Sequence, residues 1–205
     1  MSKHIHLSRF FAVAACSLAS TVITGCAAVS AIGAVAGLTG NAMEMAGLKK
    51  PENAPVEVNL TIHAGENLNA SSGQSMAVVT KIYYLKNPEQ FQRAPLTQLI
   101  DTAAEKATLG ESVLGIRELT LTPGQRFEAV EKVPKQAGYI AIAGLFYAPA
   151  PMRWKYVFKV DDVEDSGIVL GAHACALTVA TGKPTLPAGL PAYDPARLSG
   201  VQCPG

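Results

Sequence analysis

The chain has 205 residues, of which 49% are hydrophobic and 16% are charged, and its formal net charge is +1. A charge this close to zero, without a cluster of lysines and arginines, argues against a nucleic-acid-binding protein. The length suits an export signal followed by one folded domain of ordinary size.

The N-terminus has the layout of a secretory signal. Two basic residues precede an uncharged apolar run over residues 10–23, and the small residues Thr24 and Gly25 then precede Cys26. A charged start, an apolar stretch and a small-residue cleavage site are the three parts of such a signal. Small residues directly before a cysteine are typical of bacterial lipoproteins, whose cysteine carries acyl chains after cleavage. We therefore predict a signal peptide over residues 1–25 and lipidation at Cys26.

An uncleaved transmembrane helix is the alternative for this region, because no charged residue occurs over residues 10–43 and about 20 apolar residues can span a bilayer. Residues 27–47, however, are rich in alanine and glycine, which favours a flexible tether. We predict a lipidated tether over residues 26–54. The two residues after the cysteine are alanines, and the absence of aspartate there indicates the outer membrane, although inner-membrane retention stays open.

Two strands and a long connection follow the tether. Apolar and polar residues alternate over residues 56–62, which predicts a half-buried strand, and the β-branched and aromatic residues of 78–85 predict a second. The connection is longer than the 2–5 residues usual in hairpins. Almost all of its residues favour loops: Gly65, Glu66, Asn67, Leu68, Asn69, Ala70, Ser71, Ser72, Gly73, Gln74 and Ser75. Long loops on a rigid sheet often carry function.

A helix is predicted after the second strand. Pro95 suits its first turn and Gly110 suits its end. Apolar residues recur between them at helical spacing: Leu96, Leu99, Ile100, Ala103 and Ala107. We therefore expect a helical insertion over about residues 90–114.

Further strand patterns continue to the last fifth of the chain. They cover residues 116–121, 126–130, 139–147, 154–160, 168–170 and 174–179. Residues 139–147 are almost wholly apolar, as in a strand covered on both faces. The aromatic stripe Trp154, Tyr156 and Phe158 is interpreted as core, with a partner groove as the alternative. Seven or eight strands separated by turn signals predict a mainly β protein, a two-sheet β-sandwich over residues 55–181 with a short helical insertion.

Two cysteines remain after processing, Cys175 and Cys203. Exported proteins fold in an oxidising compartment, where such a pair usually forms a disulfide. We predict this bond, which would fix the Pro-rich C-terminal tail of residues 182–205 to the strand holding Cys175. Two free thiols are the alternative.

Signals of catalysis are missing from the sequence. It contains neither the Gly-x-Ser-x-Gly motif of hydrolases nor a phosphate-binding glycine loop. The mature chain has two histidines, His63 and His173, and no other metal-binding residues occur near them in the sequence at zinc-site spacing. The acidic cluster of residues 161–165 lacks the ligand spacing of a calcium loop. We predict a protein that is not an enzyme, with no cofactor and no metal site.

A series of short motifs resembles the TssJ outer-membrane lipoproteins of type VI secretion systems. In chain order these motifs are Val58-Asn59-Leu60, Asn67-Leu68-Asn69, the strand of residues 78–86, Phe91, residues 118–124 with their Pro-Gly turn, and Tyr139-Ile140-Ala141-Ile142-Ala143 before a Trp-containing strand. No single motif is specific, but their order and spacing are. The resemblance covers about residues 56–179.

The resemblance implies a transthyretin-like β-sandwich with added helices, anchored in the outer membrane and facing the periplasm. It also implies a partner, the periplasmic C-terminal part of the inner-membrane protein TssM. The family contact is the loop between the first two strands, which here is Gly65–Ser75. This sequence has Ala70-Ser71-Ser72 where the family often has proline and aspartate after Leu-Asn, so individual contacts do not transfer directly.

Two functional hypotheses follow. The first is a scaffold lipoprotein that binds TssM through the Gly65–Ser75 loop, with Leu68 as its apolar anchor. The alternative is a transthyretin-like periplasmic lipoprotein that binds a small molecule or an envelope component, which would require an apolar pocket between the sheets.

Overall fold

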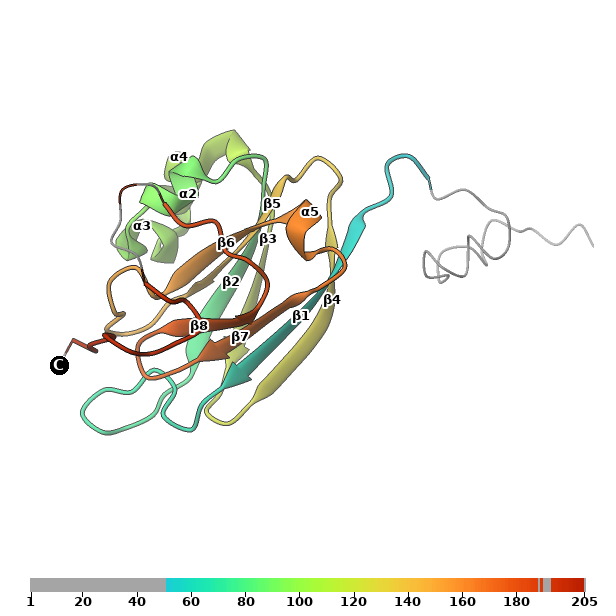
Figure 1. The fold of residues 1–205 in the computed structure, drawn as a ribbon. Helices are drawn as coiled ribbons and strands as arrows, with labels where there is room; N and C mark the ends of the chain where they lie inside the picture. The colour runs from blue at the N-terminus through green and yellow to red at the C-terminus, as the bar shows by residue number, and fades with distance from the viewer. Residues whose placement is uncertain (1–50, 188, 190–192, 205) are drawn as a thin grey trace, which may run out of the picture. The chain divides into compact units, whose positions relative to one another are not determined.

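Two four-stranded β-sheets stacked face to face form the folded part of the chain (Figure 1), for which the computed structural model describes residues 51–187, 189 and 193–204. One sheet has the strand order β4-β1-β7-β8 and the other β3-β2-β5-β6. The strands are β1 (Val56–Ala64), β2 (Val78–Leu85), β3 (Val113–Leu121), β4 (Arg126–Val133), β5 (Tyr139–Gly144), β6 (Lys155–Lys159), β7 (Ile168–Ala172) and β8 (Leu177–Thr181). The prediction of a mainly β two-sheet sandwich is confirmed.

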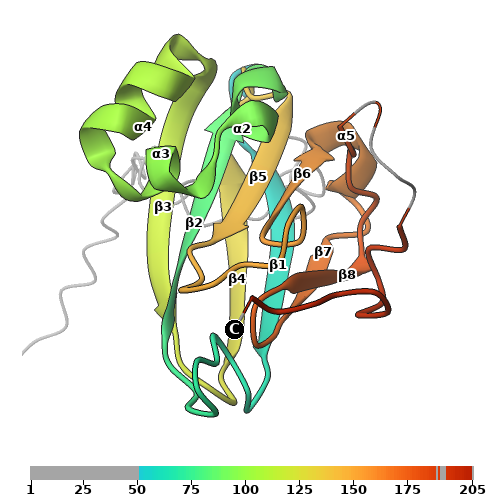
Figure 2. The same cartoon turned by 90° about the vertical axis from the view of Figure 1, so that its left-hand side faces the viewer.

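Burial explains why the first two strands differ in sequence. In β1, Val58, Leu60 and Ile62 face the other sheet and are buried, whereas the alternating polar residues lie outside. In β2, six of the eight residues are buried and Tyr84 packs against the core. Both faces of this strand are covered, one by the other sheet and one by short helices (Figure 2). The same two-sided cover explains the apolar β5, of which five residues are buried.

The helical insertion between β2 and β3 is present but divided. Its segments are α2 (Glu89–Arg93), α3 (Leu96–Ile100), α4 (Thr102–Leu109) and the 3-10 turn η2 (Gly110–Ser112). Asp101 separates α3 from α4 because its backbone is extended and its carboxylate accepts a hydrogen bond from the Ala104 amide at 2.7 Å. This is the N-cap geometry that begins a new helix.

The break at Asp101 changes which residues face the sheet. The prediction of one continuous helical face was wrong, because Ala103 and Ala107 are exposed. Glu105 and Leu109 are buried in their place. None of the helices in the described part of the chain is both long and apolar enough to cross a bilayer.

Two boundaries near the C-terminus also differ from the sequence patterns. The strand expected over residues 154–160 ends at Lys159, and the acidic segment after it forms the short helix α5 (Val160–Val163). Cys175 lies in the loop between β7 and β8 instead of in a strand. It forms a disulfide with Cys203, so the tail is fixed to that loop.

A buried polar cluster joins the helical insertion to the second sheet. The Lys81 ammonium donates hydrogen bonds to Glu105 Oε1 at 3.0 Å and to the Leu99 carbonyl oxygen at 2.9 Å. The Tyr83 hydroxyl donates to the same Glu105 oxygen at 2.5 Å. Lys81 and Glu105 are each only 5% exposed. Burial and the Glu105 carboxylate raise the pKa of Tyr83, so the phenol stays protonated and remains a donor.

Removing the carboxylate from this cluster should destabilise the fold. We expect Glu105→Ala to lower the free energy of unfolding by about 3 kcal/mol, because the buried Lys81 charge would lose its close partner and keep only the exposed Glu118 carboxylate, 4.0 Å away. Glu105→Gln should lower the free energy of unfolding by less, since the glutamine amide oxygen can still accept hydrogen bonds from Lys81 and Tyr83. Urea unfolding followed by circular dichroism measures both variants. Equal stability of Glu105→Ala and the parent would show that the cluster does not hold the insertion in place.

Candidate functional site

The β1–β2 connection lies at the end of the sandwich opposite the helical insertion (Figures 1 and 2). Its base is tied to the β7–β8 loop by two backbone hydrogen bonds: the Gly65 amide donates to the Ala172 carbonyl at 2.8 Å, and the Asn69 amide donates to the His173 carbonyl at 3.0 Å. The loop is therefore part of the folded end of the domain and has a defined shape.

Leu68 is fully buried in the main hydrophobic core. Its amide donates to the Gly65 carbonyl and its carbonyl accepts from the Met76 amide, both at 3.0 Å. The expectation that Leu68 is the apolar anchor for a partner is therefore wrong, because a side chain without exposed surface cannot contact another protein. Leu68 instead fixes the loop to the sandwich.

Asn69 is the second buried residue of the loop and connects it to the β5–β6 loop. Its side-chain amide donates to the Ala77 carbonyl at 2.8 Å, and its side-chain oxygen accepts from the Tyr147 amide at 2.7 Å. The backbone is left-handed, with φ of 48°, a conformation that asparagine tolerates better than most residues. An asparagine suits this position because it provides both a donor and an acceptor.

The tip of the loop is a tight turn. Ser71 and Gln74 exchange two backbone hydrogen bonds, at 3.0 and 2.9 Å. The two residues between them, Ser72 and Gly73, both have positive φ, as in the type I′ turns of hairpins. The residues of Gly65–Ser75 that the structure leaves exposed are Glu66, Asn67, Ser72, Gly73, Gln74 and Ser75. The surface presented by the loop is thus polar.

Tyr147 is an exposed aromatic residue whose backbone is hydrogen-bonded to this polar loop. It is 73% exposed, and its backbone amide donates the hydrogen bond that the Asn69 side-chain oxygen accepts. The sequence pattern placed Tyr147 at the end of a buried strand, but β5 ends at Gly144. Phe146 then turns inward, with 1% exposure, so that Tyr147 points outward. Only the tertiary structure shows that the Tyr147 backbone lies next to the loop.

Two histidines lie in the part of the chain that the structure describes. His63 is exposed on β1, and His173 shares a hydrogen bond with Thr178 Oγ1 at 2.9 Å. Burial, assisted by the positive charge of Arg153, lowers the pKa of His173, which favours its neutral form. Among residues 51–187, 189 and 193–204, no three His, Cys, Asp or Glu side chains are close enough together to bind a metal ion.

The predicted signal peptide, Cys26 and the first part of the predicted tether, up to residue 50, lie outside the described residues. The described chain begins at Pro51, five residues before β1. The lipidation site therefore remains a prediction from the sequence.

Comparison with known proteins identifies relatives of this domain. Residues 56–175 match the family model described as "Type VI secretion lipoprotein, VasD, EvfM, TssJ". A search of curated protein sequences gave no significant match. Among solved structures, the T6SS lipoprotein TssJ1 from Pseudomonas aeruginosa is 25% identical, with a TM-score of 0.56 over 63% of this chain and 98% of that one.

Two further structures share the fold. A chain of the type VI membrane complex is 23% identical, with a TM-score of 0.56, and covers 61% of this chain and 98% of its own. A chain in the structure of the T6SS protein TssM C-terminal domain from EAEC is 24% identical, with a TM-score of 0.53, and covers 60% of this chain and 96% of its own. The sandwich fold is therefore shared with this group of structures.

Loss of the Asn69 side chain should loosen the loop. We expect Asn69→Ala to lower the free energy of unfolding by about 1–3 kcal/mol, because the Ala77 carbonyl and the Tyr147 amide lose their partner in a partly buried setting. Hydrogen exchange of the Tyr147 amide should also become faster. Asn67→Ala is the matched control, since Asn67 is exposed in the same loop. Similar stability and exchange in the two variants would contradict the role assigned to Asn69.

Proposed function

Because the chain belongs to the TssJ family of type VI secretion lipoproteins, we propose that it anchors a type VI secretion membrane complex in the outer membrane by binding the periplasmic C-terminal region of TssM. Family membership supports a structural role in the envelope, not an enzymatic one. Two of the similar structures, the type VI membrane complex and the TssM C-terminal domain, support this choice of partner.

The proposed anchor is Cys26, acylated after removal of residues 1–25. Two or more acyl chains hold a protein on a bilayer far more firmly than one. The proposed tether of residues 26–54 would have an end-to-end distance of about 30 Å if flexible. That reach lets the sandwich domain face the periplasm at a distance from the membrane surface. The absence of aspartate after the cysteine supports the outer membrane as the location.

The proposed contact surface combines the exposed part of Gly65–Ser75 with Tyr147, and the observation that carries it is the Asn69 side chain, which holds both in one arrangement. Tyrosine is enriched among the residues that dominate binding energy at interfaces, whereas small polar residues provide hydrogen bonds around them. Since Leu68 and Asn69 fix the loop before binding, little conformational entropy is lost on association. Tyr147 therefore replaces Leu68 as the proposed apolar anchor.

Substitution of the exposed ring should weaken the complex while leaving the fold intact. We expect Tyr147→Ala to reduce the affinity for a periplasmic TssM fragment by at least about tenfold, as is typical of an aromatic residue central to an interface. Val130→Ala is the control, because Val130 is also exposed, at 53%, but lies on β4. Isothermal titration calorimetry measures both. If Tyr147→Ala and Gln74→Ala each bind like the parent, the proposed surface is wrong.

Loss of lipidation at Cys26 has a separate expected outcome. Cys26→Ser should leave the domain folded and able to bind TssM in solution but should abolish type VI secretion, since the complex would lose its attachment to the outer membrane. Secretion of a type VI substrate into the medium is the readout, with binding of the purified variant to TssM as the control. Normal secretion by cells carrying this variant would show that lipidation is dispensable.

A further inference from the structure

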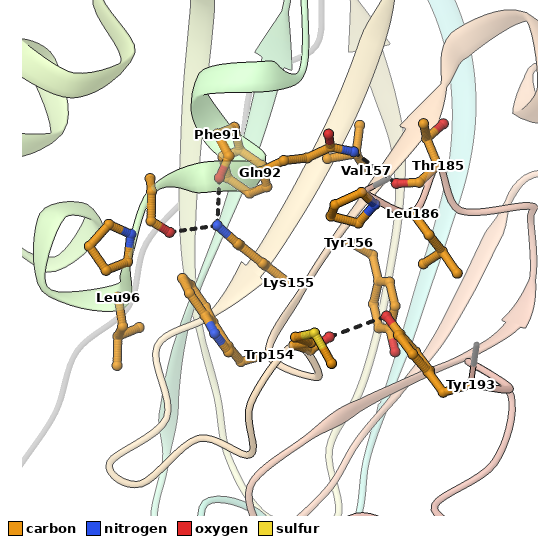
Figure 3. A pocket seen from close by; sticks show the side chains of 14 residues that line it. Phe91, Gln92, Leu96, Trp154, Lys155, Tyr156, Val157, Thr185, Leu186 and Tyr193 are labelled. Atoms are coloured by element: carbon orange, nitrogen blue, oxygen red, sulfur yellow. Dashed lines mark hydrogen bonds between the residues drawn. The ribbon is translucent and has the colours of Figure 1, made fainter. Parts of the chain in front are cut away.

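An apolar cavity beside β6 has no part in the proposed TssM contact. Its volume is about 400 Å³, and three separate parts of the chain enclose it: the helical insertion, β6 and the C-terminal tail (Figure 3). Its apolar lining includes Phe91, Leu96, Trp154, Val157 and Leu186. The alternative hypothesis placed a pocket between the sheets, whereas this cavity lies along the edge of one sheet.

The tail wall of the cavity is fixed by specific contacts. The Thr185 amide donates to the Val157 carbonyl at 2.7 Å, and the Gln92 side chain donates to the Thr185 carbonyl at 2.9 Å. Nearer the C-terminus, the Cys175–Cys203 disulfide attaches the tail to the β7–β8 loop. The family match ends at residue 175, before both β8 and the tail wall.

Lys155 is the one charged residue among the described residues that line the cavity. Its ammonium donates to the carbonyl oxygens of Phe91 and Ala94, at 2.5 and 2.6 Å, and lies 4.8 Å from the centre of the Trp154 ring. No ion pair joins it to a carboxylate within the part of the chain that the structure describes. An ammonium has three donors, so one remains for a ligand.

Lys155 carries a positive charge into the cavity wall, and a second cation, Arg153, contacts another lining residue. Burial lowers the pKa of Lys155 to about 8, so the group still carries its charge at neutral pH. Arg153, which is 5% exposed, lies 4.6 Å from the centre of the Tyr193 ring that also lines the cavity. Its guanidinium donates to the backbone carbonyls of Asp194 and Arg197 and has no carboxylate partner among the described residues. A negative group in the cavity would complement the Lys155 charge.

We propose that this cavity binds a single-chain amphiphile with a carboxylate headgroup, whose apolar chain lies against the aromatic wall and whose carboxylate pairs with Lys155. The volume falls within the range of small-molecule sites, which are mostly apolar with a few well-placed polar groups. A neutral amphiphile would leave the Lys155 charge unpaired, and a cationic one would be repelled. This proposal is independent of TssM binding, which involves other elements.

Trp154 provides a direct test, because it is the single tryptophan of the chain and lines the cavity. The mature chain carrying Cys26→Ser, which has no acyl chain of its own, is titrated with decanoate below its micelle-forming concentration. We expect a saturable change in tryptophan emission. Decanol should bind about tenfold more weakly, and decyltrimethylammonium should give no saturable change. Absence of saturation with decanoate, or equal binding of decanol, would overturn the proposal.

Substitutions can distinguish the contribution of the ligand headgroup to binding from that of the apolar cavity wall. Lys155→Met should reduce decanoate affinity to that of decanol, whereas Lys159→Met should leave it unchanged, since Lys159 is exposed on the same strand and pairs with Asp161. Leu186→Phe narrows the cavity without touching Lys155 and should weaken both ligands alike. Circular dichroism confirms that each variant is folded. Decanoate binding that is unchanged by Lys155→Met or Leu186→Phe would place the ligand elsewhere and reject the site.

Discussion

The geometry of the candidate contact surface depends on one asparagine side chain. Asn69 donates to one residue of its own loop and accepts from the amide of Tyr147, while its backbone amide bonds the β7–β8 loop. Three connections at one end of the sandwich therefore meet at a single buried residue, Asn69. Because a buried donor or acceptor without a partner is costly, this arrangement keeps a polar loop tip and an exposed aromatic ring in fixed relation to each other.

The opposite end of the sandwich is organised differently. There the helical insertion covers one face of β2, and the buried Lys81–Glu105 pair with Tyr83 joins the two. The insertion and the C-terminal tail together enclose the apolar cavity along β6. The domain thus has a polar, loop-built end, which is the proposed TssM contact, and an apolar edge, which is the proposed amphiphile site. The two sites share no residue, so one can be altered without the other.

Sequence patterns predicted the sandwich because alternation over residues 56–62 and the apolar 78–85 segment depend directly on which faces are covered. They placed the helical insertion but missed its break, because a periodic apolar pattern outweighed the capping signal of Asp101. The loop was located by its length and composition, whereas the burial of Leu68 and the exposure of Tyr147 depend on tertiary packing. No local pattern distinguishes a leucine that fixes a loop from one that meets a partner.

Hydrogen exchange of the mature chain, alone and with a periplasmic TssM fragment, tests the central claim most directly. The amides of Ser72, Gly73 and Ser75 lie in the exposed tip, so they should exchange quickly in the free protein. We expect TssM to slow their exchange and to leave the exchange of amides in the helical insertion unchanged. Protection confined to the insertion or to the exposed edge of β4, with the tip still exchanging quickly, would contradict it.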